Sequence, residues 1–309
     1  MISITQPGFY TLIQDAGRAH YRSYGMPLSG VLDTDAYRLA NWLVGNTKQE
    51  AVLEITLKGP VLKFHSAAII GITGADLQPL LNGKPVPTNQ TLSVPKDAVL
   101  QFGKCITGCR TYLAFSGGLC LPKMMGSTAT YTEAKVGGLS GVPLQKGDCI
   151  PLGNSKAFQL RKVPSRLHCK ATKTLAVRVL PGPENTLFDK KSLVSFETSE
   201  YRIATASNRM GYRMEGSVLQ TFQPVHLLSS GIVPGTIQVP PNGQPIVLLA
   251  DAQTTGGYPR IANVISADLS FLAQQKPGDC LRFRMVTLAQ AHDLWIQKEN
   301  MFAKLLDAD

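Results

Sequence analysis

Short apolar runs, separated by glycines and prolines, recur along the whole of this 309-residue chain. Many of the 28 glycines and 20 prolines fall at the ends of these runs. Short runs bounded by turn-forming residues are typical of β-strands rather than helices. The sequence therefore predicts strands over residues 52–57, 60–65, 68–73, 77–81, 91–94, 98–102, 110–116, 175–180, 200–206, 235–239, 245–250, 262–266 and 280–286.

Two segments have helical spacing instead. The first lies near residues 34–44, where Asp33 can cap the first amide groups. The second lies near residues 288–306 and begins with a capping box formed by Thr287 and Gln290. With so few helices, the sequence predicts a mostly β fold built of barrels or sandwiches.

The length of the chain favours two domains. We expect a β-rich domain over residues 1–160 with one helix, and a second β-rich domain over residues 170–309 that ends in a helix. The basic stretch 156–173 is the predicted linker. The sequence leaves open whether the two domains are interleaved.

Two kinds of turn stand out. Asn82-Gly83 and Asn242-Gly243 each lie between predicted strands, and Asn-Gly favours the type I′ turn of a tight hairpin. The segments LQKGDCIPL (144–152) and QQKPGDCLRF (274–283) both place Gly-Asp-Cys at a turn before a strand. The repeated segment could mean that the chain has two related halves, or that the same type of turn arose independently at the two places.

The formal charge of +10 favours anionic partners. The lysines and arginines are scattered along the chain, and no aromatic residues accompany them in a pattern typical of nucleic-acid binding. We therefore expect no nucleic-acid partner. The apolar runs fall short of the roughly 20 residues that span a bilayer, and the start lacks a signal-peptide pattern. We therefore expect a cytoplasmic protein away from membranes, with six reduced cysteines that form no zinc site.

Two polar, glycine-containing segments could carry chemistry. In residues 7–46, Asp15 and Arg18 lie close together, although the pair could simply satisfy itself within an ordered loop. In residues 206–216, Arg209 and Arg213 flank Met-Gly-Tyr. The fixed fork of donors on arginine suits a carboxylate or phosphate, whereas two exposed arginines on a hairpin are the alternative.

The stretch LLADAQTTGGYPRI (248–261) is the third candidate. Consecutive glycines after two threonines can point several backbone N–H groups in one direction, so residues 254–257 are a predicted anion-binding nest. Asp251 and Tyr258 are the nearby groups that could move a proton. The alternative is a tight turn in which the threonine hydroxyls bond locally.

Six motifs follow one another along the chain: PG-x-x-T-x-x-QD-x-GR, SG-x-x-D-x-x-A-x-RLAN-x-LVGN, LE-x-T-x-x-GP, RTYLAFSGG, NRMGYR-x-EG and PGTIQVPPNGQPI-x-L-x-AD-x-QTTGGYP. In this order they resemble the allophanate-hydrolase-subunit-2-like proteins, also called the biotin-dependent carboxyltransferase family. Members include the C-subunit of the bacterial 5-oxoprolinase, an antagonist of a sporulation kinase inhibitor, and part of the carboxyltransferase region of urea carboxylase.

The resemblance implies a cyclophilin-like β-barrel architecture, and it is closest to the 5-oxoprolinase subunits. It implies ATP-dependent opening of 5-oxo-L-proline to L-glutamate, with ATP as cofactor and Mg²⁺ left open. It also implies two partners without which the chain is inactive: a B-subunit, which is allophanate-hydrolase-subunit-1-like, and a LamB/YcsF-type hydrolase subunit.

The resemblance implies site roles for the motif residues, in which Asp251 or Asp15 handles a proton or a metal, and it leaves the metal site itself unknown. We expect Asp251, Asp15 and Tyr258 to act in catalysis. Asp251 could instead bind a metal or brace its turn. We expect the substrate or its phosphate to be bound by Arg18, Arg209, Arg213, Gln238, Thr254, Thr255, Gly256 and Gly257.

Two alternatives stay open. The chain could be the carboxyltransferase module of a biotin-dependent, urea-type carboxylase, with biotin arriving on a carrier, or a non-catalytic antagonist of a kinase inhibitor. The chain also departs from the family, because residues 126–130 are GSTAT where the family commonly has G-S-R-S-T. A ligand role for residues 127–130 is therefore left open.

Overall fold

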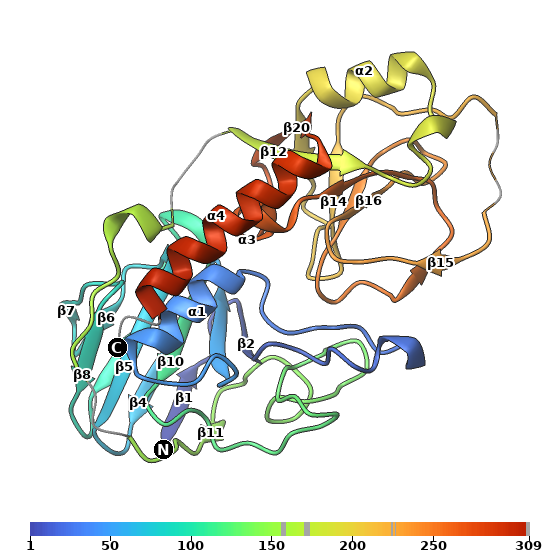
Figure 1. The fold of residues 1–309 in the computed structure, drawn as a ribbon. Helices are drawn as coiled ribbons and strands as arrows, with labels where there is room; N and C mark the ends of the chain where they lie inside the picture. Colours follow the sequence, from blue (N-terminus) through green and yellow to red (C-terminus); the bar gives the residue numbers. More distant parts are fainter. Residues whose placement is uncertain (156–158, 170–173, 224, 226, 307–309) are drawn as a thin grey trace. The chain divides into compact units, whose positions relative to one another are not determined.

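A computed structural model describes residues 1–155, 159–169, 174–223, 225 and 227–306 (Figure 1). The chain divides into two compact units. The first unit consists of Met1–His20 and Leu28–Ala171, and the second of Tyr21–Pro27 and Thr172–Asp309. The two units are therefore interleaved in sequence, because a short segment near the N-terminus belongs to the second.

The first unit contains two antiparallel sheets whose apolar faces share one core. Side chains from both sheets, such as Leu62, Phe64, Leu53 and Ile70, form this core. One sheet has the strand order β11-β1-β4-β9-β6-β7 and the other β2-β3-β10-β5-β8. The strands are β1 (Ile2–Gln6), β2 (Tyr10–Gln14), β3 (Val52–Thr56), β4 (Val61–Phe64), β5 (Ala68–Asp76), β6 (Leu80–Leu81), β7 (Lys84–Pro85), β8 (Thr91–Val94), β9 (Val99–Gln101), β10 (Thr107–Phe115) and β11 (Cys149–Ile150).

Helix α1 (Thr34–Leu43) packs against β5 and β10 of this unit. It begins where the sequence predicts, because the Asp33 side chain accepts hydrogen bonds from the backbone N–H groups of Asp35 and Ala36. The apolar positions of the helix are largely buried. The 3₁₀ turn η2 (Ser165–Leu167) follows later in the same unit.

The second unit is a closed barrel with the strand order β12-β19-β16-β17-β14-β13-β20. Strands β12 and β20 pair in parallel, and the other neighbours pair antiparallel. The mostly β class and a β-barrel are thus confirmed. The barrel strands are β12 (Thr174–Pro181), β13 (Tyr201–Ile203), β14 (Gly211–Glu215), β16 (Thr236–Gln238), β17 (Ile246–Leu248), β19 (Arg260–Val264) and β20 (Cys280–Met285), beside a two-stranded ribbon of β15 (Ser230–Gly231) and β18 (Thr255–Gly256).

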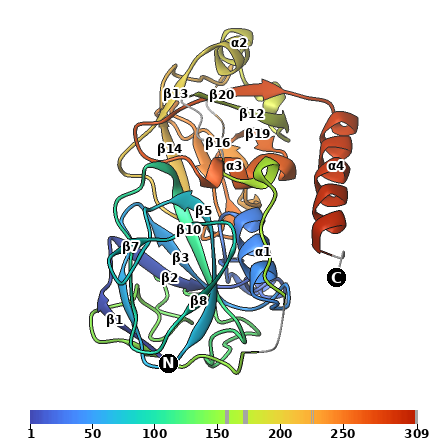
Figure 2. The ribbon, with the colours of Figure 1, turned by 90° about the vertical axis from the view of Figure 1, so that its left-hand side faces the viewer.

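In the described part of the second unit there are three α-helices, α2, α3 and α4 (Figure 2). Helix α4 (Leu288–Leu306) matches the prediction, and the capping box forms, since the Thr287 and Gln290 side chains each bond the other's backbone N–H. Helices α2 (Lys190–Thr198) and α3 (Leu269–Ala273) are short and have few buried apolar positions, so their periodicity was not visible in the sequence. The remaining 3₁₀ turns are η1 (Arg22–Tyr24), η3 (Asn185–Leu187) and η4 (Ser266–Asp268).

One of the two predicted Asn-Gly turns is confirmed and the other is wrong in type. Asn82 and Gly83 both have positive φ, 49° and 78°, and join the paired strands β6 and β7. At Asn242-Gly243 only the glycine has positive φ. Strands β16 and β17 do pair, but residues 239–245 join them as a longer loop, because the two prolines at 240–241 have no N–H for the ladder.

The Gly-Asp-Cys echo corresponds to one turn built twice. In the turn Gln145–Asp148, the backbone N–H of Asp148 donates to Gln145 O, and Asp148 Oδ2 accepts from Gln145 N. In the turn Lys276–Asp279, Asp279 and Lys276 form the same two hydrogen bonds. The glycines have φ of 95° and 93°, and β11 and β20 start two residues later, at the cysteine. Each turn then exchanges two backbone hydrogen bonds with one neighbouring isoleucine, Ile4 in the first unit and Ile203 in the second.

Among the described residues, none of the helices combines the length and the apolar character needed to cross a membrane. The longest of them, α4, buries only Ala291 and Phe302 and carries charged residues along its length.

Two buried tyrosines on the barrel strands differ in their hydrogen bonding. Tyr201 and Tyr212 are both buried, but the Tyr201 hydroxyl has no hydrogen-bond partner among the described residues, whereas the Tyr212 hydroxyl donates to Gln275 O at 2.8 Å. Tyr201→Phe should be neutral or stabilise the fold by up to about 1 kcal/mol, and Tyr212→Phe should cost about 1 kcal/mol. Urea denaturation measures both. An equal loss from the two variants would contradict this account.

Candidate functional site

Asp15, directly after β2, is buried and holds two loops of the first unit together. Its carboxylate accepts hydrogen bonds from Gly17 N at 2.8 Å and Ser127 Oγ at 2.6 Å. It also accepts from Thr128 N at 2.6 Å and Thr128 Oγ1 at 3.0 Å. Since an ionised carboxylate offers about four acceptor sites, this geometry favours a brace over a group open to a metal or substrate.

Arg18 is fully buried in the same loop. Its Nη2 donates to Ala129 O at 2.5 Å. Position 137 requires a glycine, because its φ is 74° and a Cβ there would lie 2.0 Å from Ala129 O, as well as 2.4 Å from Nη2 of Arg18. Arg18 therefore faces the interior of the first unit. Residues 127–129, whose ligand role the sequence left open, bind these two motif side chains in the structure.

Arg209 and Asp251, taken from two motifs of the second unit, form a buried ion pair. Arg209 Nε lies 2.8 Å from Asp251 Oδ2, and Nη2 lies 3.0 Å from Oδ1. Asp251 N also donates to Arg209 O at 3.1 Å. The arginine fork predicted to hold an external anion thus holds an internal carboxylate in two-point contact. Of the roles left open for Asp251, this geometry favours the brace.

Arg213 does not join Arg209 in a clamp. It lies on β14, where Tyr212 and Met214 are buried and Arg213 is exposed, as the alternation of a strand requires. Arg209 precedes the strand and is buried in its ion pair. The expected convergence of the two arginines is therefore corrected, because the strand turns Arg213 toward solvent.

The predicted nest at residues 254–257 is also corrected. Thr255–Gly256 is the strand β18, paired with β15, and Thr254 O accepts from Ile232 N. None of these four residues has the positive φ that a nest uses. The glycine at 256 lets a side chain of the protein itself approach the backbone, because a Cβ there would lie 2.6 Å from Gln238 Nε2.

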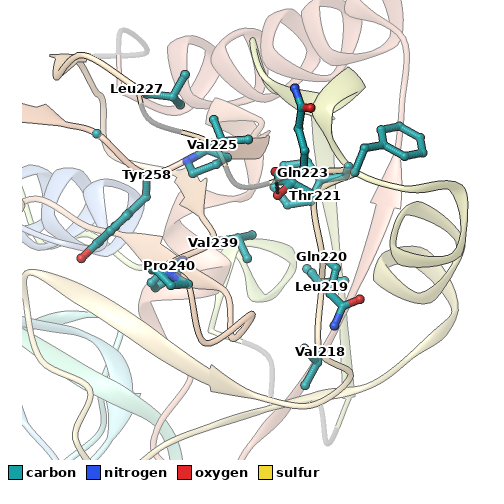
Figure 3. Close-up of a pocket in the computed structure, with 15 residues that line it drawn as sticks. Val218, Leu219, Gln220, Thr221, Gln223, Val225, Leu227, Val239, Pro240 and Tyr258 are labelled. Atoms are coloured by element: carbon teal, nitrogen blue, oxygen red, sulfur yellow. Dashed lines mark hydrogen bonds between the residues drawn. The ribbon is translucent and has the colours of Figure 1, made fainter.

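Gln238 and Tyr258 meet at the end of this stretch. Gln238 is buried, and its Nε2 donates to Tyr258 O at 3.3 Å, so it supports the turn. Tyr258 is 47% exposed and lines a cavity of about 710 Å³ in the second unit. In Figure 3 its ring extends away from the wall formed by Val218–Thr221. Of the three predicted proton-handling residues, Tyr258 is the one exposed to solvent.

Arg260 ends the stretch and fixes it from the other side. Its Nε lies 2.6 Å from Glu184 Oε2, its Nη2 2.5 Å from Oε1, and its Nη1 donates to Gly231 O at 3.0 Å. The hydrogen bonds from Arg260 hold the pKa of the Glu184 carboxyl below its ordinary value of 4.5. The turn is thereby joined to both β15 and the start of η3.

A buried polar cluster of the first unit was not among the predicted site residues. Glu54 on β3 accepts from Leu32 N at 2.9 Å and from the Tyr112 hydroxyl at 2.8 Å, and Arg110 Nε lies 3.9 Å from its other oxygen. Burial, and then the charge of Glu54, raises the pKa of Tyr112 well above 10.0. A carboxylate in the middle of the otherwise apolar run VLEIT was the sequence signal for this cluster.

Among the described residues, no group of three or more His, Cys, Asp or Glu side chains is arranged to hold a metal ion. The structure thus brings the predicted residues together in pairs and braces. Asp15 and Arg18 bind one loop, Arg209 binds Asp251, and Gln238 supports Tyr258.

The fold and motifs match known proteins. The sequence pattern of the family described as carboxyltransferase domain, subdomain A and B, matches residues 24–285. The chain belongs to this family. The match confirms the family that the motifs indicated, and it spans residues of both compact units.

Relatives of the family fall into two groups. The 5-oxoprolinase C-subunit of Escherichia coli is 39% identical over 309 residues, 99% of this chain and 97% of that protein. The Haemophilus influenzae 5-oxoprolinase C-subunit is 37% identical, with 95% and 94% covered. The Saccharomyces cerevisiae urea amidolyase is 31% identical over 99% of this chain, which covers only 18% of that protein.

A solved structure shares the whole fold. The crystal structure of the K. lactis urea amidolyase matches with a TM-score of 0.92 at 28% identity, over 97% of this chain and 19% of that chain. This family fold therefore occurs both as a chain of this length and as a small part of much longer polypeptides.

The ion pair of Arg209 and Asp251 predicts how the motif responds to mutation. Asp251→Asn should lower the free energy of unfolding by about 3–5 kcal/mol, because it removes the buried carboxylate that balances the charge of the Arg209 guanidinium. The double variant Arg209→Met/Asp251→Leu should recover most of this loss, since it leaves no buried charge. Urea denaturation of the three proteins measures the effect. A single variant as stable as the wild type would show that the pair is no brace.

The Glu184–Arg260 pair predicts a pH dependence. Because the pKa of Glu184 is lowered in the folded state, its stabilisation is present above pH 4.5 and is lost as the pH falls through the folded-state pKa. Glu184→Gln should therefore destabilise the protein at pH 7, and the difference from wild type should shrink in acid. Urea midpoints across pH measure this. Glu133→Gln, at an exposed position, is the control and should show little difference at either end.

Proposed function

We propose that this chain acts as the C-subunit of a 5-oxoprolinase complex. The observation that carries the proposal is its likeness to the E. coli 5-oxoprolinase C-subunit, which extends over 99% of one chain and 97% of the other. The likeness therefore includes residues of both compact units. The urea amidolyase of S. cerevisiae, by contrast, is matched over only 18% of its length.

The proposed reaction is the ATP-dependent opening of 5-oxo-L-proline to L-glutamate. An amide carbonyl is a poor electrophile, so water alone opens the ring slowly. Transfer of the terminal phosphoryl group of ATP to the carbonyl oxygen, with release of ADP, creates a leaving group there. Attack of one water on the activated carbon and cleavage of the ring C–N bond, with the nitrogen leaving as the amine, then give an acyl phosphate. A second water hydrolyses this acyl phosphate to glutamate and phosphate. We place these steps in a complex with a B-subunit and a LamB/YcsF-type hydrolase subunit.

The residues predicted to bind the phosphates do not fit that task in the described structure. The fork of Arg209 is occupied by Asp251, the stretch 254–257 forms a strand, and Arg213 faces away. We therefore assign no step of phosphoryl transfer to these residues. Their part in the proposal is to hold the two motif loops in fixed positions.

A second candidate function has its own support. The TM-score of 0.92 with the K. lactis urea amidolyase favours a carboxyltransferase module, to which a carrier domain would deliver carboxybiotin. The two functions differ in what the chain needs: ATP and 5-oxoproline in one case, and a biotinylated carrier in the other. Assays with each set of substrates separate them.

Reconstitution tests the leading proposal. We expect that co-expression with the B-subunit and the LamB/YcsF-type protein yields a complex that releases glutamate from 5-oxoproline only when ATP is present. The isolated chain should release none, because the reaction is assigned to the complex. Glutamate is measured by an enzyme-coupled assay, with ADP release measured in parallel.

Omission of each subunit in turn is the control. A soluble, fully assembled complex that forms no glutamate would contradict the proposal. Glutamate formation by the isolated chain would contradict the requirement for partners.

A further inference from the structure

Two exposed lysines of the first unit, Lys58 and Lys104, lie directly opposite each other on neighbouring backbone segments. The residues on either side of the lysines supply the hydrogen bonds between the two segments: Gly59 N donates to Gly103 O at 3.1 Å, and Cys105 N to Leu57 O at 2.7 Å. In antiparallel pairing of this type the two Cα atoms lie about 4.5 Å apart, and both side chains leave the same face. The two ammonium groups can therefore reach the same small area of surface.

No carboxylate of the described structure neutralises this pair. Neither lysine forms an ion pair with any residue that the structure describes. Asp76, at the end of the adjoining strand β5, directs its Oδ1 to Gln78 N at 2.8 Å instead. Because like charges directly opposite each other destabilise strand pairing, an anionic group bound across the two lysines would relieve a cost that is present in the free chain.

The backbone at Lys58 adopts a conformation that an unconstrained turn avoids. Leu57 has a φ of 61°, and Lys58 N donates to Thr56 O at 2.7 Å across it. A three-residue turn with positive φ at its centre is rare and strained, and a leucine is poorly suited to it. Strain of this kind persists only where the surrounding structure imposes it, and it is concentrated at functional sites.

Close packing of glycines imposes this conformation. A Cβ on Gly8, whose φ is 76°, would lie 2.6 Å from Lys58 O, and a Cβ on Gly59 would lie 2.2 Å from the Cβ of Phe102. Three segments that are distant in sequence are therefore in close contact next to the lysine pair. A surface that is fixed in this way loses little conformational freedom on binding, which favours affinity.

Large apolar side chains are exposed beside the two lysines. Phe9 is 67% exposed, and its backbone N–H donates to Lys58 O at 2.8 Å. Ile106 is 59% exposed and follows Lys104 by two residues. We call Phe9, Lys58, Lys104 and Ile106 the lysine patch. Exposed apolar groups that are gathered in one place mark surfaces that bind another protein, whereas a small anion would use the lysines alone.

We propose that the lysine patch is the docking site for an acidic segment of a partner protein. Carboxylates of the segment contact Lys58 and Lys104, and its apolar side chains cover Phe9 and Ile106. Charge complementarity assigns the sign of the partner, because the patch holds two cations without a paired carboxylate. The inference does not depend on the proposed reaction.

A labelled acidic peptide tests the docking site. The probe is a short fluorescein-labelled peptide composed of glutamate, leucine and serine, and its binding is measured by fluorescence anisotropy. We expect the wild type to bind the probe, and the affinity to fall as salt is added. Lys58→Glu/Lys104→Glu should weaken binding about tenfold or more, because two attractions become repulsions. Ile106→Ser should weaken it by a smaller factor.

Lys84→Glu/Lys96→Glu is the matched control. Lys84 and Lys96 are exposed lysines of the first unit outside the lysine patch, and their reversal changes the net charge by the same amount. The affinity of this variant for the probe should equal that of the wild type. Thermal unfolding confirms that each variant is folded.

The outcomes separate the lysine patch from a general attraction between a basic protein and an acidic peptide. Equal affinity of the wild type and Lys58→Glu/Lys104→Glu, an equal loss in the control, or no binding by the wild type would overturn the docking site. A peptide with serine in place of leucine that binds as well as the probe, and is displaced by inorganic phosphate, would overturn it in favour of a small-anion site. A chain that dimerises by itself and becomes monomeric with Lys58→Glu/Lys104→Glu would overturn it in favour of a second copy.

Discussion

The second unit depends on one buried ion pair, Arg209 with Asp251. Neither charge is stable in the interior alone, because removing an ion from water costs more than the fold can readily supply. The pair also sets local geometry, since Asp251 N donates to Arg209 O and Leu249 N donates to Met210 O. These bonds extend the pairing of β14 with β17 beyond the last residues of the strands. Two motifs that are far apart in sequence thus become one structural element.

In the first unit, two buried carboxylates are stabilised mainly by hydrogen bonds from backbone N–H and hydroxyl groups. Asp15 is saturated by backbone and hydroxyl groups, and Glu54 is satisfied by a backbone N–H and the Tyr112 hydroxyl. In both units, most of the charged motif residues that were predicted to act in the site lie inside and organise loops.

Features that depend only on interactions between residues close in sequence were predictable from the sequence. The Asp33 cap, the Thr287–Gln290 capping box and the Asn82-Gly83 turn each depend on a few neighbouring residues, and all three form. The nest at 254–257 failed for a non-local reason. Consecutive glycines show only that something approaches the backbone closely, and here that group is the side chain of Gln238. Similarly, the charge of Arg209 was visible in the sequence, but its partner at Asp251 was not. The family, unlike the site, followed from motif order alone.

The turn that occurs once in each unit has a consequence for the order of folding. In both units the aspartate carbonyl is bound by the N–H of a strand residue synthesised much earlier, Ile4 in one case and Ile203 in the other. Strand β1 lies between β4 and β11, so it gains one neighbour early and the other only after residue 150 has been made. During synthesis, one edge of β1 therefore stays open to the wrong strands until the last turn of its sheet arrives.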